Sequence, residues 1–276
     1  MIKSNFNRFV PAVLLACTLF AACSKNNSTT PAPTLLKHWD IALNAKFEEP
    51  APAGRSETGS ASLNLYSDKT LKYTLTVTGL ASSDQLVAGH IHLGDPLTSG
   101  PVLVALQPTF SNGTATGTVT VRSTLSDSLI NGAIDFYVNI HSSQAPSGLM
   151  RGQLYNPVTF AQDVMMSGAN EVPAINTMAT GIALFRLTTD KTLYAKYSVS
   201  NIEAGDTSLA SHVHSGATGV NGPVIIPICA SAADFGKSLK IPGISDANLS
   251  LLTTGMVYAN VHSHNQPGGL IRGQLR

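Results

Sequence analysis

Two short stretches of the chain place histidines one residue apart, just before a glycine-containing turn. The first reads HIHLGDPLTSGPV over residues 90–102, and the second reads HVHSGATGVNGPV over residues 212–224. Imidazole is a common protein ligand for zinc and copper, and it also bonds backbone carbonyl groups. Because the pattern occurs twice, the chemistry that it supports should be present in duplicate.

A third histidine follows each pair about 50 residues later, in VNIHSSQAPSGLMRGQL and ANVHSHNQPGGLIRGQL. Side chains at positions i and i+2 of a strand point to the same face, so each HxH pair should stand side by side. If the strand that carries the third histidine is a neighbour, the three imidazoles converge and could bind copper or zinc. The candidate ligands are His90, His92 and His141 in the first copy and His212, His214 and His262 in the second.

The same residues also fit a structural role. Imidazoles beside a glycine-rich loop often bond backbone groups and fix the loop, with Asn139 and Asn260 helping. The arginine of each RGQL segment, Arg151 or Arg272, either binds an anion or fixes the loop by donating its N–H groups to carbonyl oxygens. Three interpretations are therefore open: a hydrogen-bonded cluster, a metal site, or a site for another ligand.

Alternating segments indicate the strands that must position these residues. In KYTLTVTGL, apolar residues alternate with lysine and threonine, and SASLNLYSDKTLKY predicts a hairpin with the Asp-Lys pair at its turn. FYVNIHS and GLMRGQL predict the last two strands, with His141 on the face of Tyr137 and Asn139. Long amphipathic helical stretches are absent. The sequence therefore predicts an all-β chain of two tandem Greek-key β-sandwich or barrel domains.

The N-terminus indicates the destination of the chain. A lysine and an arginine precede the apolar run FVPAVLLACTLFAA at 9–22, which is too short to span a bilayer comfortably, as in a secretion signal. Small residues directly before Cys23 resemble a bacterial lipoprotein signal, in which that cysteine is lipidated. Cys17 is a rival cleavage point, and an ordinary secretory signal is the alternative. We predict a signal peptide over 1–23, a lipid anchor in the membrane, and a location in the bacterial cell envelope outside the cytoplasm.

The rest of the sequence divides into a tether and two copies of one unit. Residues 24–36 are polar and rich in proline, as in a flexible tether. His90 and His212 lie 122 residues apart, and SDKTLKYTLTV recurs at the same offset as TDKTLYAKYSV. A repeat of about 120 residues has the size of a whole domain, so we predict domains over 37–156 and 157–276.

Composition narrows the classes of function. Charged residues make up 12% of the chain, its net charge is +1, and no run of lysine and arginine stands out, so nucleic acid is not an expected partner. Two of the three cysteines lie in the signal, which leaves Cys229 as a buried thiol with no intrachain disulfide partner. No Ser-His-Asp set, carboxylate pair or phosphate-binding loop recurs in both copies. Nothing in the sequence requires an enzyme.

The recurring elements carry a family resemblance. HxH followed by GPV, then NxH, then RGQL, resembles the chordin domain (CHRD), an extracellular β module of an animal antagonist of bone morphogenetic proteins that also occurs in bacterial secreted and lipid-anchored proteins. The resemblance covers nearly all of residues 40–276 as two complete copies. It implies an immunoglobulin-like or related β fold and a secreted location, and little about molecular activity. We expect a binding or adhesion module whose partner is an extracellular protein or glycan.

A second resemblance supports the metal hypothesis instead. In copper–zinc superoxide dismutases, which are also β-barrels, two copper ligands lie in an HxH strand, and a further histidine and an active-site arginine follow near the C-terminus. The matching residues here are His90, His92, His141 and Arg151, and His212, His214, His262 and Arg272. No histidine lies between positions 92 and 141, so the bridging and zinc ligands are missing, as is the disulfide. The alternative function is therefore a copper- or zinc-binding protein, with redox activity as a possibility.

Overall fold

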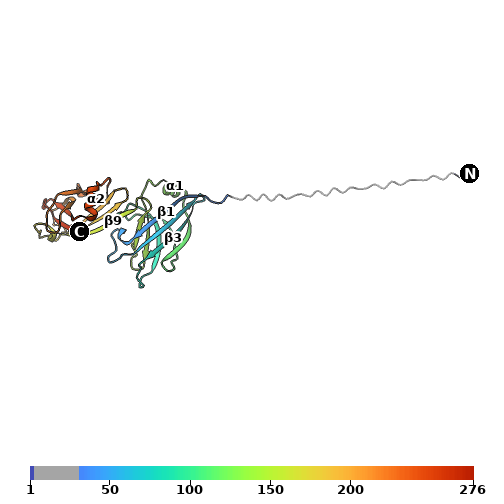
Figure 1. The fold of residues 1–276 in the computed structure, drawn as a ribbon, viewed down its shortest axis with the longest axis horizontal. Helices are drawn as coiled ribbons and strands as arrows, with labels where there is room; N and C mark the ends of the chain where they lie inside the picture. The colour runs from blue at the N-terminus through green and yellow to red at the C-terminus, as the bar shows by residue number, and fades with distance from the viewer. Residues whose placement is uncertain (3–30) are drawn as a thin grey trace. The chain divides into compact units, whose positions relative to one another are not determined.

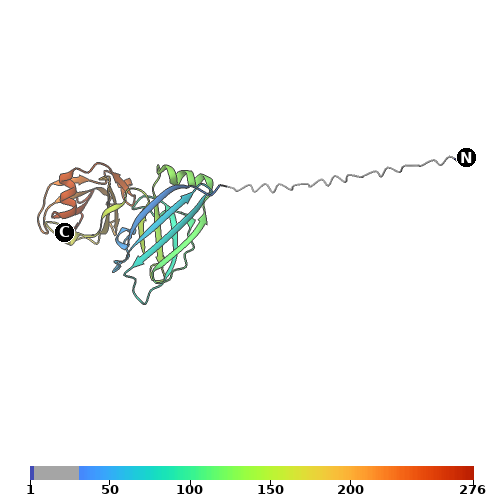
Figure 2. The same ribbon diagram turned by 45° about the vertical axis from the view of Figure 1, so that its right-hand side comes forward.

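The computed structural model describes residues 1–2 and 31–276. The chain divides into Met1–Ala32 and the compact unit Pro33–Arg276, which contains both β domains (Figures 1 and 2). The predicted signal peptide and Cys23 lie outside the described residues, apart from the first two positions. In the part of the chain that is described, no helix is long and apolar enough to cross a membrane.

The first domain is one curled sheet (Figure 1). It has eight antiparallel strands in the order β5-β4-β7-β8-β1-β2-β3-β6. Its elements are β1 (Leu35–Asn44), η1 (Ala45–Phe47), β2 (Thr58–Tyr66), β3 (Thr70–Thr78), β4 (Leu86–Leu93), β5 (Val102–Ala105), β6 (Thr114–Thr120), α1 (Ser123–Asn131), β7 (Phe136–Ser142) and β8 (Met150–Gln153). The predicted hairpin is present, because β2 and β3 are joined by a three-residue turn in which Lys69 has a φ of 68°.

The second domain repeats this sheet in the order β13-β12-β15-β16-β9-β10-β11-β14. Its elements are β9 (Val158–Ser167), η2 (Gly168–Asn170), β10 (Thr180–Thr188), β11 (Leu193–Ser200), β12 (Ser208–Ser215), β13 (Val224–Pro227), η3 (Ala232–Asp234), β14 (Leu239–Ile241), α2 (Asp246–Thr254), β15 (Val257–Ser263) and β16 (Ile271–Gln274). The predicted all-β class and the two tandem domains are confirmed. The two nine-residue helices, α1 and α2, were not predicted.

Strand alternation places the histidines on the outer face of each sheet. In the first domain, β4 pairs with β7 so that His90 lies opposite Asn139 and His92 opposite Tyr137. Between the two histidines, Ile91 points inward and is fully buried in the core, with Val138 of β7 beside it. The predicted two-residue period therefore holds on both strands. The apolar face builds the core and anchors the strands that carry the imidazoles.

The first domain covers part of the outer face of the second sheet. Arg186, in the middle of β10, is fully buried, donates a hydrogen bond to the carbonyl oxygen of Glu48, and forms an ion pair with Asp163 of β9 at 2.6 Å. Lys196 of β11 pairs with Glu49 at 2.8 Å. The short segment after η1 is therefore held by charged groups of the second domain.

Two candidate metal centres

The three histidines of each domain converge. One ring nitrogen from each of His90, His92 and His141 lies within 4.8 Å of those of the other two, and the second trio, His212, His214 and His262, has the same arrangement. Ligand nitrogens about 2.0–2.1 Å from a zinc ion lie about 3.4 Å from one another in a tetrahedral site. Rotations of the imidazoles that move their nitrogens by about 1 Å would therefore be enough to reach coordination distance.

A loop carbonyl fixes the orientation and tautomer of His92. Its Nδ1 lies 2.9 Å from the carbonyl oxygen of Gly100, which can only accept a hydrogen bond, so Nδ1 carries the proton. The Nε2 atom of the neutral ring therefore carries a lone pair. It is buried and has no hydrogen-bond partner among the described residues. The ring is also stacked on Tyr137, with centroids 4.9 Å apart, which holds it in place.

Glycine at position 100 makes this contact possible. A Cβ at Gly100 would lie 1.6 Å from the carbonyl oxygen of Leu93, so no other residue fits without moving the backbone. The N–H of Gly100 donates to the Tyr137 hydroxyl at 3.2 Å. The Gly-Pro signal in the sequence thus marks the tight approach of the loop that holds His92.

The other two imidazoles of the first trio contact each other. His141 Nδ1 lies 3.0 Å from the carbonyl oxygen of Pro146, so its proton is on Nδ1 and its lone pair is on Nε2. That Nε2 lies 3.1 Å from Nδ1 of His90. The His90 side chain forms no other hydrogen bond within the described part of the chain, and both rings are half-buried. The centre is thus exposed to solvent on the side of His90 and His141 and closed on the side of His92.

The second domain repeats these contacts. His214 Nδ1 lies 3.0 Å from the Gly222 carbonyl oxygen, and its Nε2 is buried without a partner among the described residues. His262 Nδ1 lies 2.9 Å from the carbonyl oxygen of Pro267, and its Nε2 lies 3.1 Å from Nδ1 of His212. Each domain therefore turns lone pairs of two imidazoles toward the third.

The surroundings favour the uncharged form of the histidines of each HxH pair. Burial, followed by the neighbouring rings of His141 and His92, lowers the pKa of His90, and burial lowers the pKa of His92 although the Gly100 carbonyl opposes the shift. In the second domain, burial and His262 lower the pKa of His212 to about 4. A neutral imidazole retains the lone pair that a metal ion requires.

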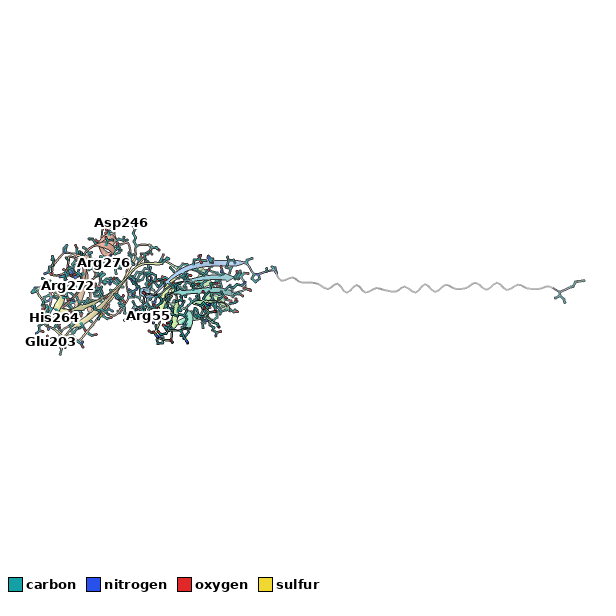
Figure 3. The ribbon with its side chains drawn as sticks, turned by 60° about the horizontal axis from the view of Figure 1, so that its bottom comes forward. Arg55, Glu203, Asp246, His264, Arg272 and Arg276 are labelled. Carbon is teal, nitrogen blue, oxygen red and sulfur yellow. The ribbon has the colours of Figure 1, made fainter. Side chains whose placement is uncertain are left out.

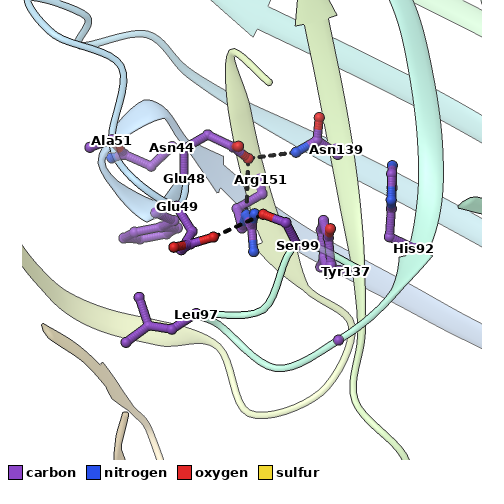
Figure 4. A network of polar contacts seen from close by, with 12 residues as sticks. Asn44, Glu48, Glu49, Ala51, His92, Leu97, Ser99, Tyr137, Asn139 and Arg151 are labelled. Atoms are coloured by element: carbon purple, nitrogen blue, oxygen red, sulfur yellow. Dashed lines mark hydrogen bonds and ion pairs between the residues drawn. The ribbon is translucent and has the colours of Figure 1, made fainter. Parts of the chain in front are cut away.

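Arg151 lies beside the centre and supports it. Its guanidinium is 2% exposed, stacks on the Tyr137 ring, and donates to Glu48 at 3.0 Å, while Asn139 donates to the same carboxylate (Figure 4). It also donates to the carbonyl oxygen of Thr98 at 3.3 Å. Among these contacts, the hydrogen bond to Thr98 fixes the glycine-containing loop. All the described contacts of Arg151 are with other residues of this chain.

Arg272 fixes its loop by a different route. It stacks on Tyr258 and donates to the carbonyl oxygens of Ala217 and Val220 at 3.0 and 2.9 Å. Its carboxylate neighbour Glu171 accepts a hydrogen bond from Asn260. Burial, only partly opposed by Arg272 and Asn260, raises the pKa of Glu171 to about 7.

Glu171 should make the stability of the second domain depend on pH. The pKa of Glu171 is higher in the folded chain than its ordinary value of 4.5. The protonated carboxyl group therefore contributes fully to the free energy of unfolding below pH 4.5, and this contribution is lost as the pH rises through about 7. Glu171→Gln should remove this loss, of order 2 kcal/mol, so the variant gains stability relative to the wild type between pH 5 and 8. Chemical denaturation across this range measures the difference. A constant difference at every pH would contradict the assignment. Glu48→Gln is the matched control, and it should destabilise the chain because it weakens the pair with Arg151.

The two glycine loops, residues 94–100 and 216–222, have different supports. In the first loop, Leu97 is buried against Leu184 and Tyr194 of the second domain, and Ser99 donates to Glu49 at 2.9 Å. In the second loop, Val220 is 54% exposed, and the loop is held by Arg272 instead. The first centre is thus braced by the neighbouring domain in addition to Arg151, whereas the second is held by Arg272.

Three pairs of supporting residues were missed in the sequence. These are Glu48 and Glu171, which accept from the asparagines, Tyr137 and Tyr258, which stack on the histidines, and the carbonyl-bearing prolines Pro146 and Pro267. All three pairs recur between the copies, so extending the repeat comparison beyond the histidines would have singled out these residues, although not the contacts that they make.

Comparison with known proteins agrees with the repeated geometry. The family model of the CHRD domain matches residues 40–154 and 163–275, and each match contains one histidine trio and one glycine loop. No curated protein and no solved structure matches the chain. The predicted domain limits, which are slightly wider, stay predictions. Two matched copies cover most of the sequence, and the chain therefore belongs to the CHRD domain family.

Proposed function

We propose that this chain is a metal-binding protein with one three-histidine site for copper or zinc in each CHRD domain. The observation that supports the proposal is the buried Nε2 of His92, and its counterpart in His214, each without a partner among the described residues. Each belongs to a residue that is 9% exposed and faces two further imidazoles.

The energetic argument favours a cation over a purely structural cluster. Leaving a buried acceptor unpaired costs about 1–3 kcal/mol. A cluster that served only to fix the loop would bear that cost at His92 in the first domain and again at His214 in the second. A cation bound in each domain would use the lone pair of the histidine there. The bonds to Gly100 and Pro146 agree with this role, because metal-binding histidines usually donate their other N–H to a carbonyl or carboxylate.

The residues of the chain would divide the work as follows. His92 and His141 would bind through Nε2, because their Nδ1 protons are committed to carbonyl oxygens. His90 would bind through Nδ1, the atom that faces His141, and the proton that Nδ1 donates to His141 would then move to Nε2 of the same ring. Three imidazoles suit both copper and zinc. Bound copper would supply redox chemistry, and bound zinc would supply a Lewis acid.

An equilibrium titration of the full chain tests this proposal. With copper and with zinc in separate experiments, each competed against a chelator of known affinity, we expect saturation at two ions per chain for at least one metal. If the chain binds no more copper and no more zinc than a protein whose surface lacks histidines, the proposal is contradicted.

The location of the chain is also proposed. A lipid on Cys23, followed by a polar tether, would hold both domains at a bacterial membrane outside the cytoplasm, where metal ions enter from the medium. Cys23→Ser should then move the chain from the membrane fraction to the soluble fraction, and an unchanged distribution would contradict the anchor.

The binding or adhesion role, with an extracellular protein or glycan as partner, stays a prediction.

A further inference from the structure

The first domain buries a carboxylate just before β4 against an arginine. The side chain of Asp84 has no exposed surface, and its Oδ2 accepts from Nη2 of Arg55 at 2.6 Å. Arg55 also pairs with Glu57 at 2.8 Å and donates to the side-chain oxygen of Gln144 at 3.3 Å. The guanidinium thus fills a pocket formed by three acceptor side chains.

The second domain retains the carboxylate and lacks the arginine. Asp206 stands before β12 as Asp84 stands before β4, and it accepts from the backbone N–H of Asn265 at 2.9 Å, as Asp84 does from Gln144 at 3.0 Å. Counting back from the matched strands β2 and β10, the counterpart of Arg55 is Thr177.

A pocket is present where the guanidinium would lie. Its volume is about 470 Å³, and its lining includes Asn176, Thr177, Glu203, Asp206, Asn265 and Gln266. Glu203 and Arg55, the residue that fills the corresponding place in the first domain, are both labelled in Figure 3. The lining carries two carboxylates and four side-chain amides and no lysine or arginine.

We infer that this pocket receives an arginine side chain from another polypeptide, in the way that the first domain receives its own Arg55. The inference goes beyond metal binding and does not depend on it. Its basis is the internal comparison, because the same acidic position binds a guanidinium in one copy and faces an open pocket in the other.

The acceptors of the pocket suit a guanidinium group. Oδ2 of Asp206 accepts a hydrogen bond from Ser263 at 2.6 Å, and a carboxylate oxygen can accept a second. Burial raises the pKa of Asp206, but hydrogen bonds from Ser263 and the backbone outweigh it and lower that pKa, so the group is charged. A planar guanidinium can donate to this carboxylate and to side-chain amide oxygens of the rim at once.

Binding of a small arginine derivative tests the inference. N-acetyl-arginine methylamide, titrated into the full chain and followed by NMR of the Asn265 and Gln266 side-chain amides, should bind with a Kd on the order of 1 mM. The neutral citrulline analogue is the matched ligand and should bind at least tenfold more weakly. Equal binding of the two compounds, or no binding of either, would overturn the inference.

A pocket-filling variant gives a second and independent readout. Thr177→Arg restores the residue found in the first domain, so it should raise the melting temperature and weaken the probe at least tenfold. Thr120→Arg, at an exposed threonine of the first domain, is the matched control and should leave binding unchanged. A Thr177→Arg variant that is folded and binds the probe as well as the wild type would contradict the assignment of the pocket.

Discussion

A chain that carries both His90→Ala and His212→Ala is expected to lose copper and zinc affinity by about 100-fold or more at each site while keeping its fold. Among the described residues, the side chains of these two histidines form hydrogen bonds only with His141 and His262. The bonds that fix the glycine loops run through the other histidines and remain intact. The substitutions therefore separate metal binding from loop fixing, and competition titration beside thermal unfolding measures both.

Two controls complete this experiment. His38→Ala and His264→Ala change histidines that belong to neither trio, so both variants should keep two ions per chain. His92→Ala removes a ligand and also the donor to Gly100, so it should lose metal at one site and stability as well. If the His90→Ala, His212→Ala chain binds as much metal as the wild type, the imidazoles serve only to fix the loops.

Arg186→Ala is expected to destabilise the chain by about 3 kcal/mol or more. The guanidinium is fully buried, and its removal takes one donor from the carboxylate of Asp163 and from each of the carbonyl oxygens of Phe47 and Glu48. Because those carbonyls belong to the first domain, unfolding should also separate into two transitions. Chemical denaturation followed by fluorescence and circular dichroism measures the stability and the number of steps.

Lys191→Ala is the matched control for this substitution. It removes a basic residue of the same domain, but the side chains of its ion pair with Asp246 are 50% and 83% exposed. Such exposed pairs contribute at most about 1 kcal/mol. Equal losses from the two substitutions would mean that the contact between the domains adds no stability, contrary to the structure.

The sequence predicted the strands and the convergence of the histidines because both depend on local alternation. FYVNIHS forms β7 as Phe136–Ser142, and the two-residue period places His141 on the face of Tyr137 and Asn139. That β7 lies beside β4 was an assumption of the sequence analysis. The sheet order shows that the two strands are neighbours, and their register places His90 opposite Asn139. The repeat supplied the rest, because each expectation for one trio had to hold for the other.

The supporting contacts could not be predicted, because they join residues that are distant in the sequence. Glu48 and Asn139 are 91 residues apart, and nothing in the local sequence of either one indicates the other. Arg186 lies at a polar position of an alternating strand, where its counterpart Asn64 bonds to partly exposed His38. Its burial results from the docking of the first domain, which local periodicity does not report.

Anomalous X-ray diffraction from crystals of the metal-loaded chain, recorded at the copper and zinc absorption edges, tests the central claim most directly. We predict one peak in each domain, bonded to Nδ1 of His90 and Nε2 of His92 and His141, and to the same atoms of His212, His214 and His262. Strong peaks elsewhere, with both trios keeping the hydrogen bonds between His90 and His141 and between His212 and His262, would contradict it.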